Sequence, residues 1–134
     1  MRNMMKITGT FDVNLKPLDT YAQGQHGVTL ARTSIDKTFH GELDASSNGE
    51  MLSAVTAVPG SAGYVAMEQV AGRLAGRQGS FALQHFGTMS DGQNRLVLEV
   101  VPDSGAGGLE GLTGAMDIRI EGGQHYYDFE FELP

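Results

Sequence analysis

Five side chains of the types that move protons or hold charge stand in rows of alternating apolar residues: Lys37, Tyr64, Glu68, His85 and His125. Lys37 lies within SIDKTFHGEL, in a row that otherwise holds an isoleucine, a phenylalanine, a glycine and a leucine. Alternation of this kind puts the row on one face of a β-strand. A buried ammonium must meet an acid or lose its proton, because an isolated charge is costly away from water. We therefore treat these five residues as candidates for a ligand-binding site inside the fold.

Two glutamates are candidate partners for Lys37. Glu68 shares its row with Tyr64 and is the first choice, whereas Glu50 shares its row with Leu52 and is the alternative. A plainer interpretation is a structural ion pair, or a lysine whose head bends out to water at a rim. All of these interpretations require that Lys37 belongs to the inward row of its strand.

The histidines allow two interpretations. His85 stands on a face with Phe81 and Met89, and His125 heads the aromatic row of the last expected strand. Inside a barrel they could serve as a general acid and a general base near neutral pH. A hydrogen-bonded core histidine is the more frequent case. His40 falls in the outward row and is expected at the surface.

Several kinds of chemistry are excluded or unsupported. The chain has no cysteine, which removes disulfides, thiolate catalysis and thiolate metal sites. It has neither HExxH nor His-x-His spacing, and its glycine-rich stretches match no phosphate-binding motif. Ser104 does not stand in a GxSxG elbow. We therefore expect no metal and no cofactor.

Composition bounds the class of protein. The 134 residues suit one domain, expected over residues 1–134, and 40% of them are hydrophobic. The formal charge of -7 and the scattered basic residues argue against nucleic acid as a partner. No apolar run approaches the roughly 20 residues that cross a bilayer, so no membrane is expected. The start lacks the apolar segment of a signal peptide, and we expect a cytoplasmic location.

The candidate residues must be positioned by strands. Asn48-Gly49, Asp91-Gly92 and Gly122-Gly123 are the expected hairpin turns. The residues from 102 to 114 are expected to form a loop with one helical turn near Leu109, and segment 64–75 fits helical and strand spacing equally. Alternation predicts strands over residues 6–15, 28–43, 49–58, 79–89, 95–102, 115–121 and 124–133.

Seven or eight strands with short connections predict an all-β fold, either a sandwich or a barrel. A closed barrel removes the edge strands that a sandwich leaves, and the 19 glycines suit the bends of a closed sheet. The fold class is therefore a closed or nearly closed antiparallel β-barrel of about eight strands. Four small residues that we expect to face inward would leave volume in it: Gly9, Ala54, Ala66 and Gly87.

The stretches SIDKTFHGEL, SSNGEML, SAGYVAMEQVAGRLAGRQGSFALQHFGTM, VVPDSGAGGLEGLTG and HYYDFEFEL together resemble a bacterial family of small uncharacterised proteins, a domain of unknown function. The resemblance covers nearly the whole chain. It implies a barrel similar to that of allene oxide cyclase, and hence a strand over 64–75. It brings no catalytic residues, and a likeness of fold is weak support for function.

Three functions are compatible with these observations. The first is a binding module whose barrel mouth holds a small apolar or amphipathic molecule, with Lys37 meeting its acidic group. The second is an isomerase or cyclase that transfers protons through Lys37, Glu68, His85 or His125. The third is a structural or interaction protein whose barrel is filled by its own side chains. A homodimer is expected, formed through an outer patch of Phe86, Val97 and Val101.

Overall fold

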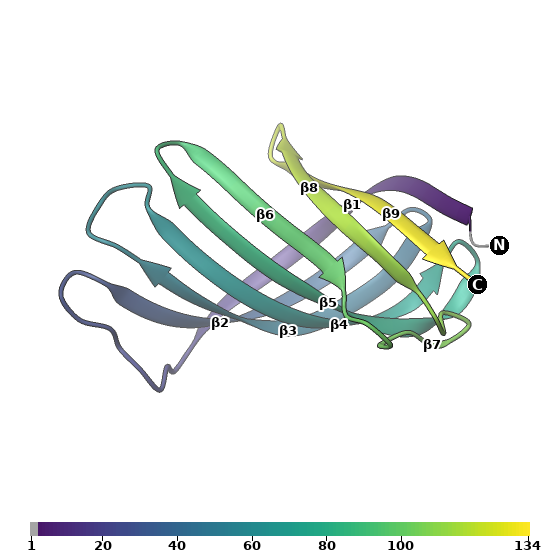
Figure 1. Ribbon diagram of the computed structural model, residues 1–134, viewed down its shortest axis with the longest axis horizontal. Helices are drawn as coiled ribbons and strands as arrows, with labels where there is room; N and C mark the ends of the chain where they lie inside the picture. Colours follow the sequence, from purple (N-terminus) through teal and green to yellow (C-terminus); the bar gives the residue numbers. More distant parts are fainter. Residues whose placement is uncertain (1–2) are drawn as a thin grey trace.

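The computed structural model describes residues 3–134, which form nine β-strands and no helix within that range (Figure 1). Eight of the strands are long, and β7 has only two residues. The strands are β1 (Asn3–Leu18), β2 (Thr29–His40), β3 (Leu43–Val55), β4 (Ala62–Leu74), β5 (Arg77–Ser90), β6 (Gln93–Val100), β7 (Ala106–Gly107), β8 (Thr113–Glu121) and β9 (Gln124–Leu133).

The sheet closes on itself. Its order is β4-β3-β2-β1-β9-β8-β6-β5, and β5 pairs back with β4. Every pair is antiparallel, and β7 adds a short pairing at the start of β5. The prediction of a closed antiparallel barrel is confirmed. Segment 64–75, which fitted two patterns, lies almost wholly in strand β4 and turns at its end.

One seam of the barrel is weakly joined. β6 and β8 pair only at Glu99 and Ala115, whereas β8 and β9 pair from Thr113 to Glu121. From that single pair the two strands diverge toward the end of the barrel that carries the β5–β6 and β8–β9 turns (Figure 1). The backbone ladder is therefore incomplete along this line.

The opposite end, where β1 begins and β9 ends (Figure 1), is filled by apolar side chains. The segment between β6 and β8 closes it, because Leu109 and Leu112 are almost fully buried there. Ser104 fastens this segment: its hydroxyl donates to the Val101 carbonyl at 2.7 Å and accepts from the Ala82 amide at 3.0 Å. Near Leu109 the chain makes hydrogen-bonded turns in place of the expected helical turn.

The expected turn at Asn48-Gly49 is wrong. The chain turns earlier, at Gly41, and β3 continues straight through Gly49, which pairs with both Ile35 and Glu68. A Cβ added at Gly49 would lie 2.0 Å from the Met67 carbonyl oxygen and 2.7 Å from the Glu68 Cα. Gly49 thus serves the close approach of two strands and not a turn.

The inward glycines do not leave the expected volume. A Cβ on Gly9 would lie 2.4 Å from the Tyr127 hydroxyl, and a Cβ on Gly87 would lie 2.3 Å from the Tyr64 ring. Both glycines therefore make room for tyrosine rings. Ala54 was also wrongly placed, because it pairs with Gly63 in the outward row.

Candidate functional site

Four neighbouring strands bring four polar side chains into the barrel. Lys37 on β2, Ser47 on β3, Glu68 on β4 and His85 on β5 all belong to inward rows, and their exposed fractions lie between 2% and 7%. Lys37 and Ser47 are direct partners in the β2–β3 ladder. We call these four residues the polar cluster. It lies between the filled end of the barrel and its open end.

Glu68 is the centre of the polar cluster. The Lys37 ammonium lies 2.8 Å from Glu68 Oε2, and the Ser47 hydroxyl donates to Oε1 at 2.7 Å. His85 Nε2 contacts the same Oε2 as Lys37. Three donors thus surround one carboxylate, which is the arrangement that compensates a buried charge.

The sequence interpretation missed Ser47 and misjudged Glu50. Ser47 was assigned to a turn because of the adjacent Asn48-Gly49, although its alternation with Ala45 was a usable signal. Glu50 lies on the outer face, where Arg32 Nε donates to its Oε1 at 2.6 Å, so it is no partner of Lys37.

The electrostatics favour the ionised form of Glu68. Burial raises the pKa of this carboxyl, but the hydrogen bond from His85, the charge and hydrogen bond of Lys37 and the hydrogen bond from Ser47 outweigh burial and lower the pKa to about 2. An ionised carboxylate only accepts hydrogen bonds, so His85 must carry a proton on Nε2 to donate to it. In the neutral ring Nδ1 is then the basic nitrogen.

Aromatic rings enclose the ammonium of Lys37. Its Nζ lies 4.9 Å from the centroid of Phe11 and 5.7 Å from that of Phe39. Ring faces attract cations, most strongly where water is excluded. This packing stabilises the Lys37 ammonium in the barrel interior, so a lysine can occupy a position in the inward, mainly apolar row of β2.

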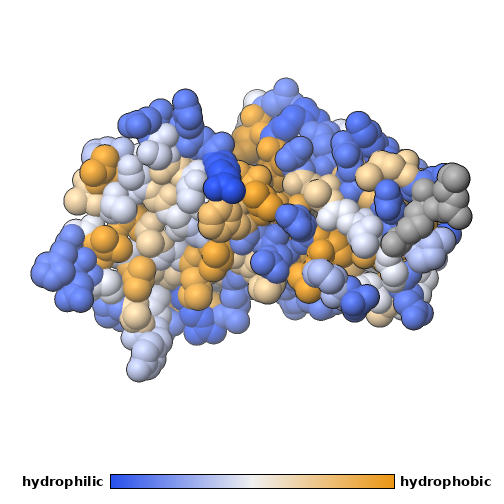
Figure 2. Space-filling view, in the orientation of Figure 1, coloured by the Kyte–Doolittle hydropathy of each residue, from blue (hydrophilic) through white to orange (hydrophobic). Residues whose placement is uncertain are grey.

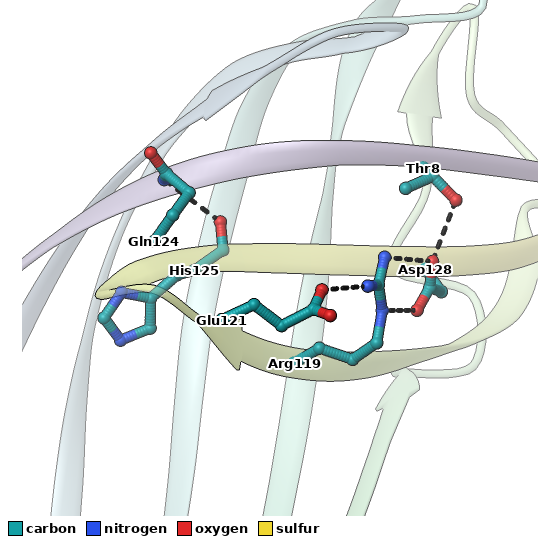
Figure 3. A network of polar contacts seen from close by, with 6 residues as sticks. All are labelled: Thr8, Arg119, Glu121, Gln124, His125 and Asp128. Atoms are coloured by element: carbon teal, nitrogen blue, oxygen red, sulfur yellow. Dashed lines mark hydrogen bonds and ion pairs between the residues drawn. The ribbon is translucent and has the colours of Figure 1, made fainter.

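His125 lies apart from the polar cluster. Its ring packs on Phe11 with centroids 5.1 Å apart, so Phe11 has Lys37 and His125 as separate neighbours. Figure 3 places the His125 ring near the β8–β9 turn. Of the five candidate residues, the structure brings Lys37, Tyr64, Glu68 and His85 together and leaves His125 outside.

Tyr64 covers His85 from the open end. The two rings meet edge to face with centroids 6.1 Å apart. Burial raises the pKa of the Tyr64 phenol, and the negative charge of Glu68 raises it further. The phenol therefore keeps its proton and can donate a hydrogen bond toward the open end.

A cavity of about 440 Å³ occupies the open end of the barrel. Two of its apolar side chains, Val55 and Ile120, are more than half exposed to solvent although they belong to inward rows. Between β6 and β8, hydrophobic surface reaches the outside (Figure 2). The inward-facing side chains of the cavity are Met51, Ser53, Val55, Ala62, Tyr64, Met89, Asn94, Leu96 and Ile120.

The outer face of β8 and β9 carries its own ionic network (Figure 3). Arg119 binds Asp128 through Nε at 2.7 Å and through a second nitrogen at 3.2 Å, and Thr8 donates to Asp128 at 2.8 Å. The hydrogen bonds from Arg119 and Thr8 lower the pKa of Asp128. Lys6 also pairs with Glu130, so two outward carboxylates of β9, Asp128 and Glu130, have cationic partners.

Within residues 3–134 no group of three histidine, aspartate or glutamate side chains is placed to hold a metal ion. The same residues include no helix of the length and hydropathy needed to span a membrane. The site is therefore described by its own side chains: a buried carboxylate with three donors, a phenol above it and an apolar cavity at the mouth.

These features define a class of protein, a small closed barrel with an internal polar cluster beneath an apolar mouth. The chain belongs to the family described as Protein of unknown function (DUF3224), whose model matches residues 7–131. The resemblance to a bacterial family of unknown function is thereby confirmed.

A solved structure supports the fold. The crystal structure of a DUF3224 protein with unknown function from Shewanella oneidensis MR-1, at 1.84 Å resolution, is 67% identical in sequence. The match covers 96% of each chain with a TM-score of 0.94. No curated protein matches the chain. The comparisons thus establish the family and the fold, and leave the function to be argued from the site.

Proposed function

We propose that the barrel binds one small apolar or amphipathic molecule that carries an acidic group. The observation that carries this proposal is the cavity of about 440 Å³ at the open end, whose walls are mainly apolar and which reaches the Tyr64 phenol. Ligand sites commonly have volumes of roughly 300–1,000 Å³, apolar walls and few polar groups. An apolar body would lie between Val55, Met89 and Ile120, with its polar end toward Tyr64.

The polar end of the ligand is best met by a donor. Tyr64 keeps its phenolic proton and can donate to a carboxylate or carbonyl oxygen. Lys37 supports an acidic ligand only indirectly, since its ammonium already pairs with Glu68 and its side chain is 5% exposed.

The seam between β6 and β8 suits an elongated molecule. Leu96 and Asn94 border the cavity from β6, and Ile120 borders it from β8. Because these two strands pair only at Glu99 and Ala115, the cavity wall lacks a continuous ladder there. A ligand too long for the cavity can extend outward between β6 and β8 without breaking strand hydrogen bonds.

The proposal is tested with 1-anilinonaphthalene-8-sulfonate, an apolar probe with an acidic group, and by native mass spectrometry of the purified chain. We expect a co-purified molecule or stoichiometric probe binding. Ile120→Asn should weaken probe binding about tenfold, since it places an amide in the apolar wall. Met4→Asn is the control on the outer face of β1, where the side chain is 56% exposed and lies away from the cavity, and it should bind as the unmodified chain does. Absence of both a molecule and probe binding overturns the proposal in favour of a barrel filled by its own side chains.

Proton transfer is a second candidate function, favoured by the contact of His85 with Glu68. An ionised carboxylate that accepts a hydrogen bond from Nε2 of a histidine fixes the orientation of the ring and leaves Nδ1 as the nitrogen that can accept a proton, as a general base must. With Tyr64 as hydrogen-bond donor to a carbonyl oxygen, His85 would take a proton from the adjacent carbon and return it elsewhere, an isomerisation that needs no cofactor.

This second candidate has a separate test. Bound carbonyl compounds should exchange their α-protons in heavy water, as followed by NMR. His85→Gln should abolish exchange while anilinonaphthalene sulfonate still binds. Exchange that persists in the His85→Gln variant would exclude the histidine as base and leave binding as the function.

A further inference from the structure

The outer face of the barrel carries a continuous apolar row. Leu52 on β3, Val65 on β4, Phe86 on β5 and Val97 on β6 are successive partners across four strands. The first three are 41–56% exposed, and Met67, two residues beyond Val65 in the outward row of β4, is also exposed. Monomeric proteins seldom present large contiguous apolar patches of this kind on a sheet. We call these five side chains the outer patch.

Two grooves of about 510 Å³ and 480 Å³ run beside the outer patch. The larger groove lies between the row and the loop before β2, where Tyr21 projects fully exposed to solvent. An exposed tyrosine beside an apolar groove is typical of interface anchors, because it buries a large ring at low entropic cost. This face of the barrel thus has both a projecting tyrosine ring and an apolar groove beside it.

Charged side chains border the outer patch and do not enter it. Arg32 pairs with Glu50 at the β2 edge. Arg95 and Glu99 stand at the β6 edge, and the Arg95 guanidinium lies 5.2 Å from the Phe86 ring centroid. Each edge therefore carries one charge of each sign. A partner with charge of one sign would be repelled at either edge, whereas a surface with the same mixture can be complementary to it.

We propose that the outer patch pairs with the same patch of a second copy of this chain in a two-fold dimer. Two-fold interfaces are self-complementary and are the commonest oligomeric solution. Counted from the bordering strand β2 to β6, five strands at about 4.8 Å spacing and seven residues at about 3.3 Å rise give a face of about 20 Å by 20 Å. With the Tyr21 loop this approaches the scale of a standard interface, about 800 Å² of accessible surface per partner. The barrel mouth stays open in such a dimer, so this inference is independent of ligand binding.

The structure refines which residues form the contact. Phe86 and Val97 are neighbours in the row, as a dimer patch requires. Val101 lies beyond the end of β6, where its amide donates to the Ala82 carbonyl at 2.9 Å beside Ser104. We therefore assign the centre of the interface to Val65 and leave Val101 outside it.

Sedimentation equilibrium of the full chain tests the proposal. Leu52→Lys places a charge in the row and should weaken dimer association about tenfold or more. Met4→Lys is the matched control, because Met4 is equally exposed, at 56%, but lies on β1 away from the outer patch. The control should remain a dimer. Circular dichroism and melting of both variants verify that each is folded.

Three results would overturn the proposed interface. One is an unmodified chain that sediments as a monomer up to millimolar concentration. The second is a dimer that survives both Leu52→Lys and Val65→Lys, which would place the contact elsewhere. Loss of the dimer in the Met4→Lys variant but not in Leu52→Lys would likewise move the interface to β1.

Discussion

The ammonium of Lys37 and the carboxylate of Glu68 are 2.8 Å apart, and the two side chains keep only 5% and 0% of their surface in contact with solvent. The pair lies beneath the mouth cavity and above the apolar filling of the other end. Burying two charges is costly, and the cost is offset here by the added donors Ser47 and His85. The ion pair of Lys37 and Glu68 therefore contributes both to the stability of the barrel and to the chemistry of its site.

Lys37→Met should destabilise the protein by about 3–5 kcal/mol, because it leaves the buried Glu68 carboxylate without its cation. Lys6→Met is the control, since Lys6 makes only an exposed pair with Glu130 and surface changes stay within about 0.5 kcal/mol. Chemical denaturation of both variants measures the difference. Equal, small losses for the two variants would mean that the Lys37 pair contributes no more than a surface pair.

The stability conferred by Glu68 should depend on acid pH. Its pKa falls from 4.5 to about 2 on folding, so its contribution is complete above about pH 4.5 and is lost as the pH falls toward 2. The shift corresponds to about 3 kcal/mol. We expect Glu68→Gln to be much less stable than the unmodified chain at neutral pH and nearly as stable near pH 2. A difference that stays constant over this range would contradict the assignment.

Gly87→Ala should disturb Tyr64. An added Cβ would lie 2.3 Å from the Tyr64 ring, so the ring must move off His85, at a cost of about 1–3 kcal/mol. Gly63→Ala is a matched strand control, since its Cβ would meet nothing closer than 3.7 Å, and it should be neutral or slightly stabilising. Urea denaturation measures both variants. Equal tolerance would show that Tyr64 is free to move.

Tyr127→Phe should cost about 1–3 kcal/mol, because it leaves buried backbone groups without a partner. The Tyr127 hydroxyl donates to the His40 carbonyl at 3.0 Å and accepts from the Leu43 amide at 3.2 Å, and so it closes the β2–β3 turn. The adjacent Tyr126→Phe is the control, because Tyr126 faces outward beside Arg119. Thermal melting compares them, and similar melting temperatures would refute the role of the hydroxyl.

The sequence predicted the barrel and most inward rows because strand alternation is a local property. The rows of Lys37, His85 and Tyr127 are read from two-residue periodicity alone, and the structure buries all three. The choice of Glu68 over Glu50 had no such basis, since both stand in alternating rows. Only the registers of β3 and β4 decide it, and register is a property of paired strands.

Two local signals misled the sequence interpretation. Asn48-Gly49 has the composition of a hairpin turn, but the glycine was selected by the neighbouring Glu68 backbone, a contact between residues distant in sequence. That error removed Ser47 from the candidate site. His125 has inward parity, yet its height along the barrel axis puts it beside Phe11 at the mouth end. Parity gives the face of a strand and not the level at which a side chain lies.

Because β6 and β8 share a single ladder pair, Glu99 with Ala115, the closure of the barrel along this line depends on very few backbone hydrogen bonds. Opening a barrel whose strands are all paired along their length requires breaking a whole row of backbone hydrogen bonds. Here β6 and β8 can separate by breaking very few. Amide protons of β6 and β8 that point into this line should exchange fastest among the long strands, and those between β3 and β4 slowest. The barrel would then open first between β6 and β8. The motion that widens its interior is therefore also the first step of its unfolding.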